Sequence, residues 1–198
     1  MKKGIIYIII NAIIENLKYF NLVELPKYVF KKFFFSDSIT ATRCAVDLFI
    51  ISKWTFVMLL WYFNVKNQII NFAVYYLIFT NIYTYFYYHV WTKDLENPFY
   101  DSERIKRRFL KLILSIAFNI VAFAYLIAQP FSDNFKWKNG YSEFNDALFF
   151  SISNSLTTSY QNVNIITEFG HSLSLIETVT SFIFLTIILA NSIPQMKE

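Results

Sequence analysis

The residues whose types and spacing best suit chemistry lie in one polar segment near the end of the chain, "SNSLTTSYQNVNIITEFG" (153–170). Its hydroxyl and amide side chains and its backbone carbonyls offer oxygen atoms, and such oxygens replace the hydration shell of ions in channel filters. Long apolar stretches precede and follow the segment. A connecting loop would have this composition, and so would a re-entrant segment that coordinates ions.

The composition indicates that membrane helices position this segment. The 198 residues are 56% hydrophobic, 21% aromatic and 16% charged, whereas soluble domains are nearer half apolar and a quarter charged. A helix needs about 20 mostly apolar residues to cross a bilayer. Four segments meet this requirement: 45–65, 68–91, 109–131 and 173–193.

The N-terminal apolar run, residues 4–14, is too short to cross a bilayer. Lysines and phenylalanines follow it as far as Phe35. This pattern predicts helices that lie in the membrane interface, with Pro26 dividing them into two.

The basic residues predict the orientation of the spans. Twelve Lys and Arg residues precede the first span or lie between the second and third, against only three on the other side: Lys66, Lys136 and Lys138. The positive-inside rule therefore places both termini of a multi-pass cell-membrane protein in the cytoplasm. The connection 132–172 then lies outside, or dips back into the membrane from outside.

The order of parts in this connection predicts a half-helix. A polar stretch (132–146) comes first, followed by a short helix-compatible run (147–156) and a polar segment that returns to Gly170. Ser142 precedes Glu143 and Asp146, as expected at a helix start. Ten helical residues cover about half a bilayer. Non-helical backbone at that depth is tolerated only where protein or a water-filled cavity satisfies it.

The segment from Asp146 to Ile193 resembles the pore module of potassium-channel-type tetrameric cation channels. The matching parts are Asp146–Ser151 as the start of a pore helix, Leu156-Thr157-Thr158 as the filter entrance, and Gly170, Ser174–Glu177 and the apolar inner helix. With the span before it, the resemblance covers about 109–193. It implies an outer helix, a pore helix, a filter, an inner helix and a homotetramer. K⁺ or Na⁺ would be the transported ion, with no bound cofactor.

The filter departs from the family pattern because residues 157–163 contain no glycine. Glycines allow the backbone of the potassium filter to aim successive carbonyl oxygens at the ion. Aligning Tyr160 with the family's filter tyrosine leaves Gln161 and Asn162 where Gly and Asp would stand. We therefore expect a weakly selective pore for monovalent cations, with an ion pathway formed by Thr157, Thr158, Ser159, Tyr160, Gln161 and Asn162.

Other residues are candidates for tuning this pathway. Asp146 and Glu168 would attract cations at the outer mouth, although a solvated loop would also carry such acids. Glu177 could line the pore or, as the resemblance implies, pack behind the filter and hydrogen-bond the pore helix. Ser181 stands where the family often has a hinge glycine. The face shared by Thr178, Ser181, Leu185, Ile188 and Ser192 would line the inner cavity, or would pack against another helix.

The predicted fold is an all-α membrane protein with four transmembrane helices, a re-entrant pore helix and filter loop between helices 3 and 4, and N-terminal interfacial helices. The predicted parts are interfacial helices (1–41), a peripheral two-helix membrane domain (42–91), a basic cytoplasmic linker (92–108) and a pore domain (109–198).

The remaining residues narrow the function class. We expect no enzyme, because the sequence has no glycine-rich phosphate loop, no metal-ligand spacing and no assembled Ser/His/Asp set. The Lys and Arg residues that give the net charge of +4 flank the apolar spans and do not form a basic face on a soluble domain. This distribution argues against binding to nucleic acid. The basic residues at 104–108 either anchor the topology or bind anionic lipid, and a regulatory protein partner is a further expectation. The alternative function is a non-conducting membrane anchor or sensor whose outer loop binds a partner.

Overall fold

The computed structural model describes residues 4–33, 37–91, 102–138 and 143–188. Part of the predicted linker (92–101) and the end of the predicted fourth span (189–193) lie outside these ranges. The chain forms two compact units, residues 1–53 and 54–198; the predicted parts, bounded at 41, 91 and 108, stay predictions. Helix α3 runs through the boundary between the two units.

The first unit begins with two short helices, α1 (Ile5–Leu17) and α2 (Glu24–Phe33), with a 3₁₀ turn at Lys18–Phe20. The segments Ile5–Phe20 and Glu24–Phe33 meet at an angle of 54°. The break comes before Pro26, not at it as predicted, because a proline in the first turn of a helix replaces an N–H that has no helical partner.

Within the described residues, three helices are long and apolar enough to cross a membrane, over Ile39–Tyr62, Ile69–Phe86 and Lys106–Ala128. They belong to α3 (Ser38–Tyr62), α4 (Gln68–Phe86) and α5 (Ser102–Ala128), so the first three predicted spans are confirmed as candidates. Helix α7 (Glu168–Phe182) continues as a π-helical turn, Ile183–Ile188, and lies within the fourth predicted span for most of its length.

Helix α3 begins seven residues before the apolar stretch that predicted it. Asp37 caps its first turn, since its carboxylate accepts hydrogen bonds from the backbone N–H groups of Ile39 (3.1 Å) and Thr40 (3.0 Å) and from the Thr40 hydroxyl (2.5 Å). These bonds, that of the Thr40 side chain first, hold the pKa of the Asp37 carboxyl below its usual value. A polar cap therefore extends the helix beyond its apolar part.

The core of the second unit surrounds the C-terminal half of α5, where every residue from Ala122 to Ala128 is buried. Polar contacts join α5 to α4. The Asn81 amide donates to the Ser115 carbonyl (3.0 Å) and to Asn119 Oδ1 (2.9 Å), and the Ser115 hydroxyl donates to Asn81 Oδ1 (2.5 Å). Hydrogen bonds of this kind hold helices together where apolar packing alone gives little specificity.

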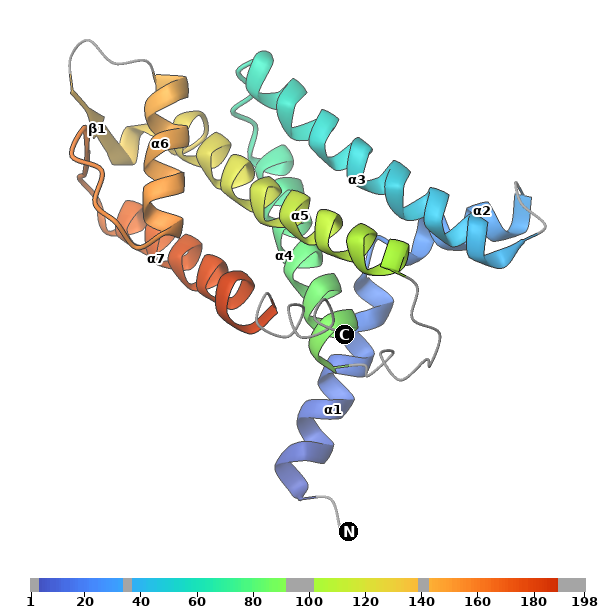
Figure 1. The fold of residues 1–198 in the computed structure, drawn as a ribbon. Coiled ribbons are helices and arrows are strands. Elements are labelled where there is room, and N and C mark those ends of the chain that lie inside the picture. Colours follow the sequence, from blue (N-terminus) through green and yellow to red (C-terminus); the bar gives the residue numbers. More distant parts are fainter. Residues whose placement is uncertain (1–3, 34–36, 92–101, 139–142, 189–198) are drawn as a thin grey trace. The chain divides into compact units, whose positions relative to one another are not determined.

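A short helix, α6 (Glu143–Ser155), packs against α5 and α7. Figure 1 shows it beside the C-terminal half of α5 and next to α7. Its position confirms the prediction of a short helix between the third and fourth segments, and it begins at Glu143, where the sequence predicted a helix start. Its thirteen residues are about 20 Å long, against a hydrocarbon thickness of about 30 Å.

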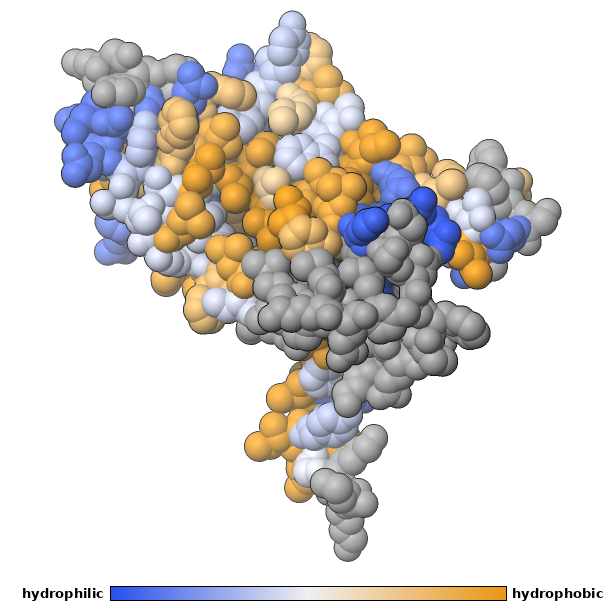
Figure 2. All heavy atoms as spheres, in the orientation of Figure 1, coloured by the Kyte–Doolittle hydropathy of each residue, from blue (hydrophilic) through white to orange (hydrophobic). Residues whose placement is uncertain are grey.

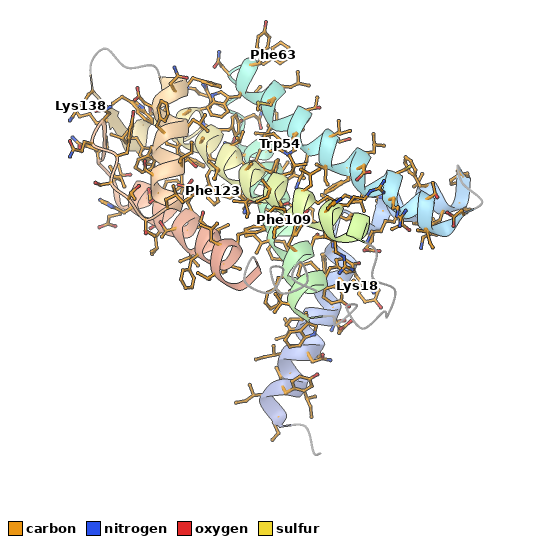
Figure 3. The ribbon with its side chains drawn as sticks, in the orientation of Figure 1. Lys18, Trp54, Phe63, Phe109, Phe123 and Lys138 are labelled. Carbon is orange, nitrogen blue, oxygen red and sulfur yellow. The ribbon has the colours of Figure 1, made fainter. Side chains whose placement is uncertain are left out.

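Two strands that the sequence analysis did not predict complete the second unit. Strand β1 (Phe135–Trp137) pairs antiparallel with β2 (Val163–Ile165), with Lys136 opposite Asn164. Figure 2 shows hydrophilic side chains gathered at the end of the unit that carries β1, and apolar side chains over the middle of α5. Lys138 lies at the β1 end and Phe109 near the beginning of α5 (Figure 3).

Candidate functional site

The six predicted filter residues belong to a loop, residues 156–162, that joins the C-terminal end of α6 to β2. Leu156, Thr157, Thr158, Ser159 and Gln161 are exposed on the chain, while Tyr160 and Asn162 are half-buried. The loop therefore presents hydroxyl, amide and backbone groups at an open surface. We call this segment the 156–162 loop.

The 156–162 loop begins in a helix-ending turn that favours glycine. The Thr158 N–H donates to the Ser153 carbonyl (2.8 Å) and the Thr157 N–H to the Asn154 carbonyl (3.0 Å), the bond pattern of a Schellman motif. This motif puts Thr157 at the left-handed position, and its φ is 57°. A β-branched residue is rare there because its side chain crowds the backbone. The two threonine hydroxyls donate to the carbonyls of Leu156 (2.7 Å) and Ser153 (3.1 Å).

Tyr160 turns back onto α6 instead of pointing outward. Its hydroxyl donates to Asp146 Oδ1 (2.5 Å) and accepts from the Asn162 amide (3.2 Å), and its ring lies 6.1 Å from that of Phe149 between centroids. The side chains of Tyr160 and Asn162 thus hold the loop against α6. The hydroxyl and amide groups of Thr157, Thr158, Ser159 and Gln161 remain at the exposed surface.

The expectation that Asp146 is an exposed acid at the outer mouth is not met, because its side chain is 1% exposed. Helix α6 begins at Glu143, three residues before Asp146, so Asp146 lies in the first turn of the helix. There the Tyr160 hydroxyl bonds to its carboxylate. The other carboxylate oxygen, Oδ2, is buried and has no hydrogen-bond partner among the described residues. Glu168, in the first turn of α7, is exposed.

Glu177 is fully buried between α6 and α7. Its carboxylate accepts hydrogen bonds from the Ser151 hydroxyl and from the Asn154 amide (2.7 Å), and the Ser151 hydroxyl also lies 2.8 Å from the Ile120 carbonyl of α5. Within one chain Glu177 therefore contacts the short helix, which is the second of its two predicted settings, and does not line an open surface.

The other predicted cavity residues on α7 also face α6. The Ser181 hydroxyl donates to Ser155 Oγ (2.9 Å) and the Thr178 hydroxyl to Asn154 Oδ1 (3.1 Å). Leu185 is half-buried, and the side chain of Ile188 lies outside the described part. We call this contact the polar seam, formed by Ser151, Asn154 and Ser155 of α6 and by Ser174, Glu177, Thr178 and Ser181 of α7.

The end of the 156–162 loop that leads into β2 is held by contacts that the sequence did not predict. We call them the clasp, which consists of the β1–β2 pair and the contacts among Asn134, Thr167 and Gly170. The Lys138 N–H donates to the Asn162 carbonyl (3.1 Å), which continues the ladder between β1 and β2. Thr167 caps α7 by accepting from the Gly170 N–H (3.1 Å) and donates its hydroxyl to Asn134 Oδ1 (2.6 Å). A Cβ on Gly170 would lie 3.0 Å from the Asn134 carbonyl oxygen and 2.8 Å from Ile165 Cγ2, so this contact requires glycine.

The site offers oxygen atoms and helix-end dipoles rather than a metal-binding cluster. Among the residues that the structure describes, no group of three or more His, Cys, Asp or Glu side chains could hold a metal ion. The C-terminal end of α6, which carries the negative end of the helix dipole, directly precedes the loop. This arrangement suits weak coordination of a cation by hydroxyl, amide and carbonyl oxygens.

We expect Thr157→Gly to raise the free energy of unfolding. The left-handed conformation costs an L residue about 1–2 kcal/mol, while the greater freedom of glycine in the unfolded chain offsets about 0.5–1 kcal/mol of that gain. The net increase should be about 0.5–1 kcal/mol, measured by denaturant unfolding in detergent micelles. Thr157→Ala keeps the Cβ atom and should give no such gain. A glycine variant less stable than the alanine variant would contradict the strained turn.

No family model, no curated protein and no solved structure matches this chain.

Proposed function

We propose that the chain is an ion channel subunit that conducts monovalent cations through a tetrameric pore. The observation that carries this proposal is the exposed 156–162 loop at the end of α6, a helix too short to cross a bilayer that packs against α5 and α7. The potassium-channel-like order of outer helix, short helix, polar loop and inner helix supports the same assignment.

The length of α6 supports a re-entrant path. The helix begins at the end of the unit that carries the β1–β2 clasp and extends for about 20 Å. If that end faces the outer solution, the end of α6 that leads into the 156–162 loop lies about two thirds of the way through a hydrocarbon core of about 30 Å. Exposed polar backbone at such a depth is stable only where it lines a water-filled cavity. A pore provides that cavity.

A single loop encloses no channel, so the proposal requires several copies around a common axis. The exposed side chains of the loop would then face the axis, and the clasp and the Tyr160–Asp146 bond would hold each loop from behind. Closed rotational symmetry is the usual arrangement for identical subunits. The resemblance to potassium-channel-type pores makes four the proposed number.

The chemistry of the loop supports cations and weak selectivity. Several α6 helices would direct the negative ends of their dipoles at the axis, and exposed Glu168 would add charge near the outer solution. The loop contains no glycine, and Tyr160 is bonded to Asp146. Side-chain oxygens of Thr158, Ser159 and Gln161 would therefore provide much of the coordination, in a filter shorter or wider than that of potassium channels.

The localisation that fits this function is a cell membrane, with both termini in the cytoplasm and the clasp outside. The three candidate spans support a membrane location, and the distribution of Lys and Arg supports the orientation. An anionic lipid or a regulatory protein at the basic residues 104–108 would be a further partner in this arrangement.

We expect Thr158→Ala and Asn162→Ala to change the relative permeability of K⁺ and Na⁺ in single-channel recordings with ion substitution. The first removes a hydroxyl oxygen, and the second removes the amide that holds Tyr160. Each change should be roughly two- to tenfold, because one lost polar contact is worth about 0.5–1.4 kcal/mol. Asn164→Ala, at an exposed position of β2, is the matched control and should leave the permeability ratio unchanged.

Unchanged selectivity in both variants would refute the filter assignment. A monomer or dimer without ion flux in liposomes would instead support the non-conducting anchor or sensor.

We expect cysteines placed near the start of α5 and directly after β1 to react from opposite sides of the membrane. Lys138 and Arg107 are both exposed, and Cys44→Ala removes the single native thiol. In intact cells a membrane-impermeant maleimide should label the Lys138→Cys variant, whereas the Arg107→Cys variant should react only after permeabilisation. Labelling of both variants, or of Arg107→Cys alone, in intact cells would overturn the topology.

A further inference from the structure

Asn154 bonds to α7 with every polar atom of its side chain. Its amide nitrogen donates to the Ser174 carbonyl (2.9 Å) and to a Glu177 carboxylate oxygen (2.7 Å), and its Oδ1 accepts from the Thr178 hydroxyl (3.1 Å). An amide can make few bonds beyond these. A displacement of α7 along α6 would therefore break several bonds to this one residue.

The backbone of Asn154 bonds to the other functional part of the site. Its carbonyl accepts from the Thr157 N–H (3.0 Å), and the neighbouring Ser153 carbonyl accepts from the Thr158 N–H (2.8 Å). These two bonds define the turn that starts the 156–162 loop. One residue thus joins α7, through its side chain, to the beginning of the loop, through its main chain.

Glu177 makes this connection rigid. One of its carboxylate oxygens accepts from Asn154 and the other from Ser151, whose hydroxyl lies 2.8 Å from the Ile120 carbonyl of α5. The Glu177 carboxylate is therefore held by two residues of α6, one turn apart. A displacement of α7 would strain both of these bonds as well as those of Asn154.

The turn at the start of the loop is sensitive to such movement. Thr157 has a φ of 57°, whereas the other non-glycine residue with positive φ in the described part is an asparagine, Asn64, a type that tolerates this region. The bonds to the Ser153 and Asn154 carbonyls hold Thr157 in a conformation that its side chain disfavours. A small loss of these bonds allows the turn to relax.

We propose that Asn154 is the positioning residue through which α7 sets the conformation of the 156–162 loop. Its role in conduction rests on the proposed function, while the mechanical connection between α7 and the loop does not. In a channel this connection makes the permeation pathway respond to the position of the inner helix.

The test measures the exposure of the loop by the rate at which a thiol reagent modifies a Ser159→Cys variant that also carries Cys44→Ala. Asn154→Ala should change this rate by about fivefold, the effect expected when hydrogen bonds that hold a turn are lost. Thr178→Val removes one bond to Asn154 Oδ1 without changing the shape of the side chain, and should change the rate in the same direction by less. The double variant should match Asn154→Ala, because both substitutions remove the same contact.

Thr186→Val is the matched control. Thr186 is exposed on the continuation of α7, and its hydroxyl bonds to the Phe182 carbonyl of its own helix. This variant should leave the modification rate unchanged. If Asn154→Ala fails to fold, Thr178→Val compared with Thr186→Val gives the same test. Equal rates in Thr178→Val and Thr186→Val, or in Asn154→Ala and Thr186→Val, overturn the proposal.

Recordings from the same variants separate this proposal from the proposed function. If the chain passes no ions but shows the predicted modification rates, the role of Asn154 is supported and the channel function is contradicted. The opposite outcome is a chain that conducts ions and in which Thr158→Ala changes selectivity, while Asn154→Ala and Thr178→Val change neither the modification rate nor the permeability ratio. That result would support the channel function and contradict the role of Asn154.

Discussion

The polar seam between α6 and α7 is the interaction on which the rest of the second unit depends. Glu177 has no exposed surface, and a buried carboxylate is stable only when its oxygens are hydrogen-bonded. Ser151 and Asn154 provide those bonds, and both lie on the face of α6 that meets α7. Removing either partner would leave a buried polar group unsatisfied, which costs more than the bond itself contributes. The seam therefore fixes how α6 lies against α7.

The fixed position of α6 determines what the following loop can do. The helix ends at Ser155, and the next residues cannot continue it because Thr157 takes the left-handed conformation. Tyr160 and the β1–β2 clasp hold the loop from the side of the protein, so its hydroxyl and amide groups are left at the exposed surface. A chain with this arrangement in a membrane has a polar surface that water, ions or another protein surface can cover favourably, whereas lipid cannot.

The sequence predicted the elements that depend on local composition and missed those that depend on distant partners. Apolar runs identified α3, α4 and α5 as candidate spans, and the short apolar run near Phe150 identified α6. The start of α3 was missed because it depends on the Asp37 cap, which lies before the apolar residues. The β1–β2 pair was missed because each strand has three residues and is stabilised by a partner far along the chain.

The same distinction between local composition and distant partners applies to the site residues. The exposure of the threonines and of Gln161 follows from their polar types, which a sequence shows directly. The burial of Asp146 depends on Tyr160 folding back over α6, and the inward direction of Thr178 and Ser181 depends on their partners Asn154 and Ser155. A polar stripe on a helix has the same spacing whether it faces water or another polar helix, so its neighbour could not be read from the sequence.

In the proposed channel, the 156–162 loop lines a pore shared by several copies of the chain. The most direct measurement is the single-channel current of the Ser159→Cys variant, in a Cys44→Ala background, before and after a bulky thiol reagent is added. The account predicts a cation current that falls in discrete steps as each subunit is modified, and no change in the Cys44→Ala parent. A chain that passes no current, or a current that the modification of residue 159 leaves unchanged, would contradict it.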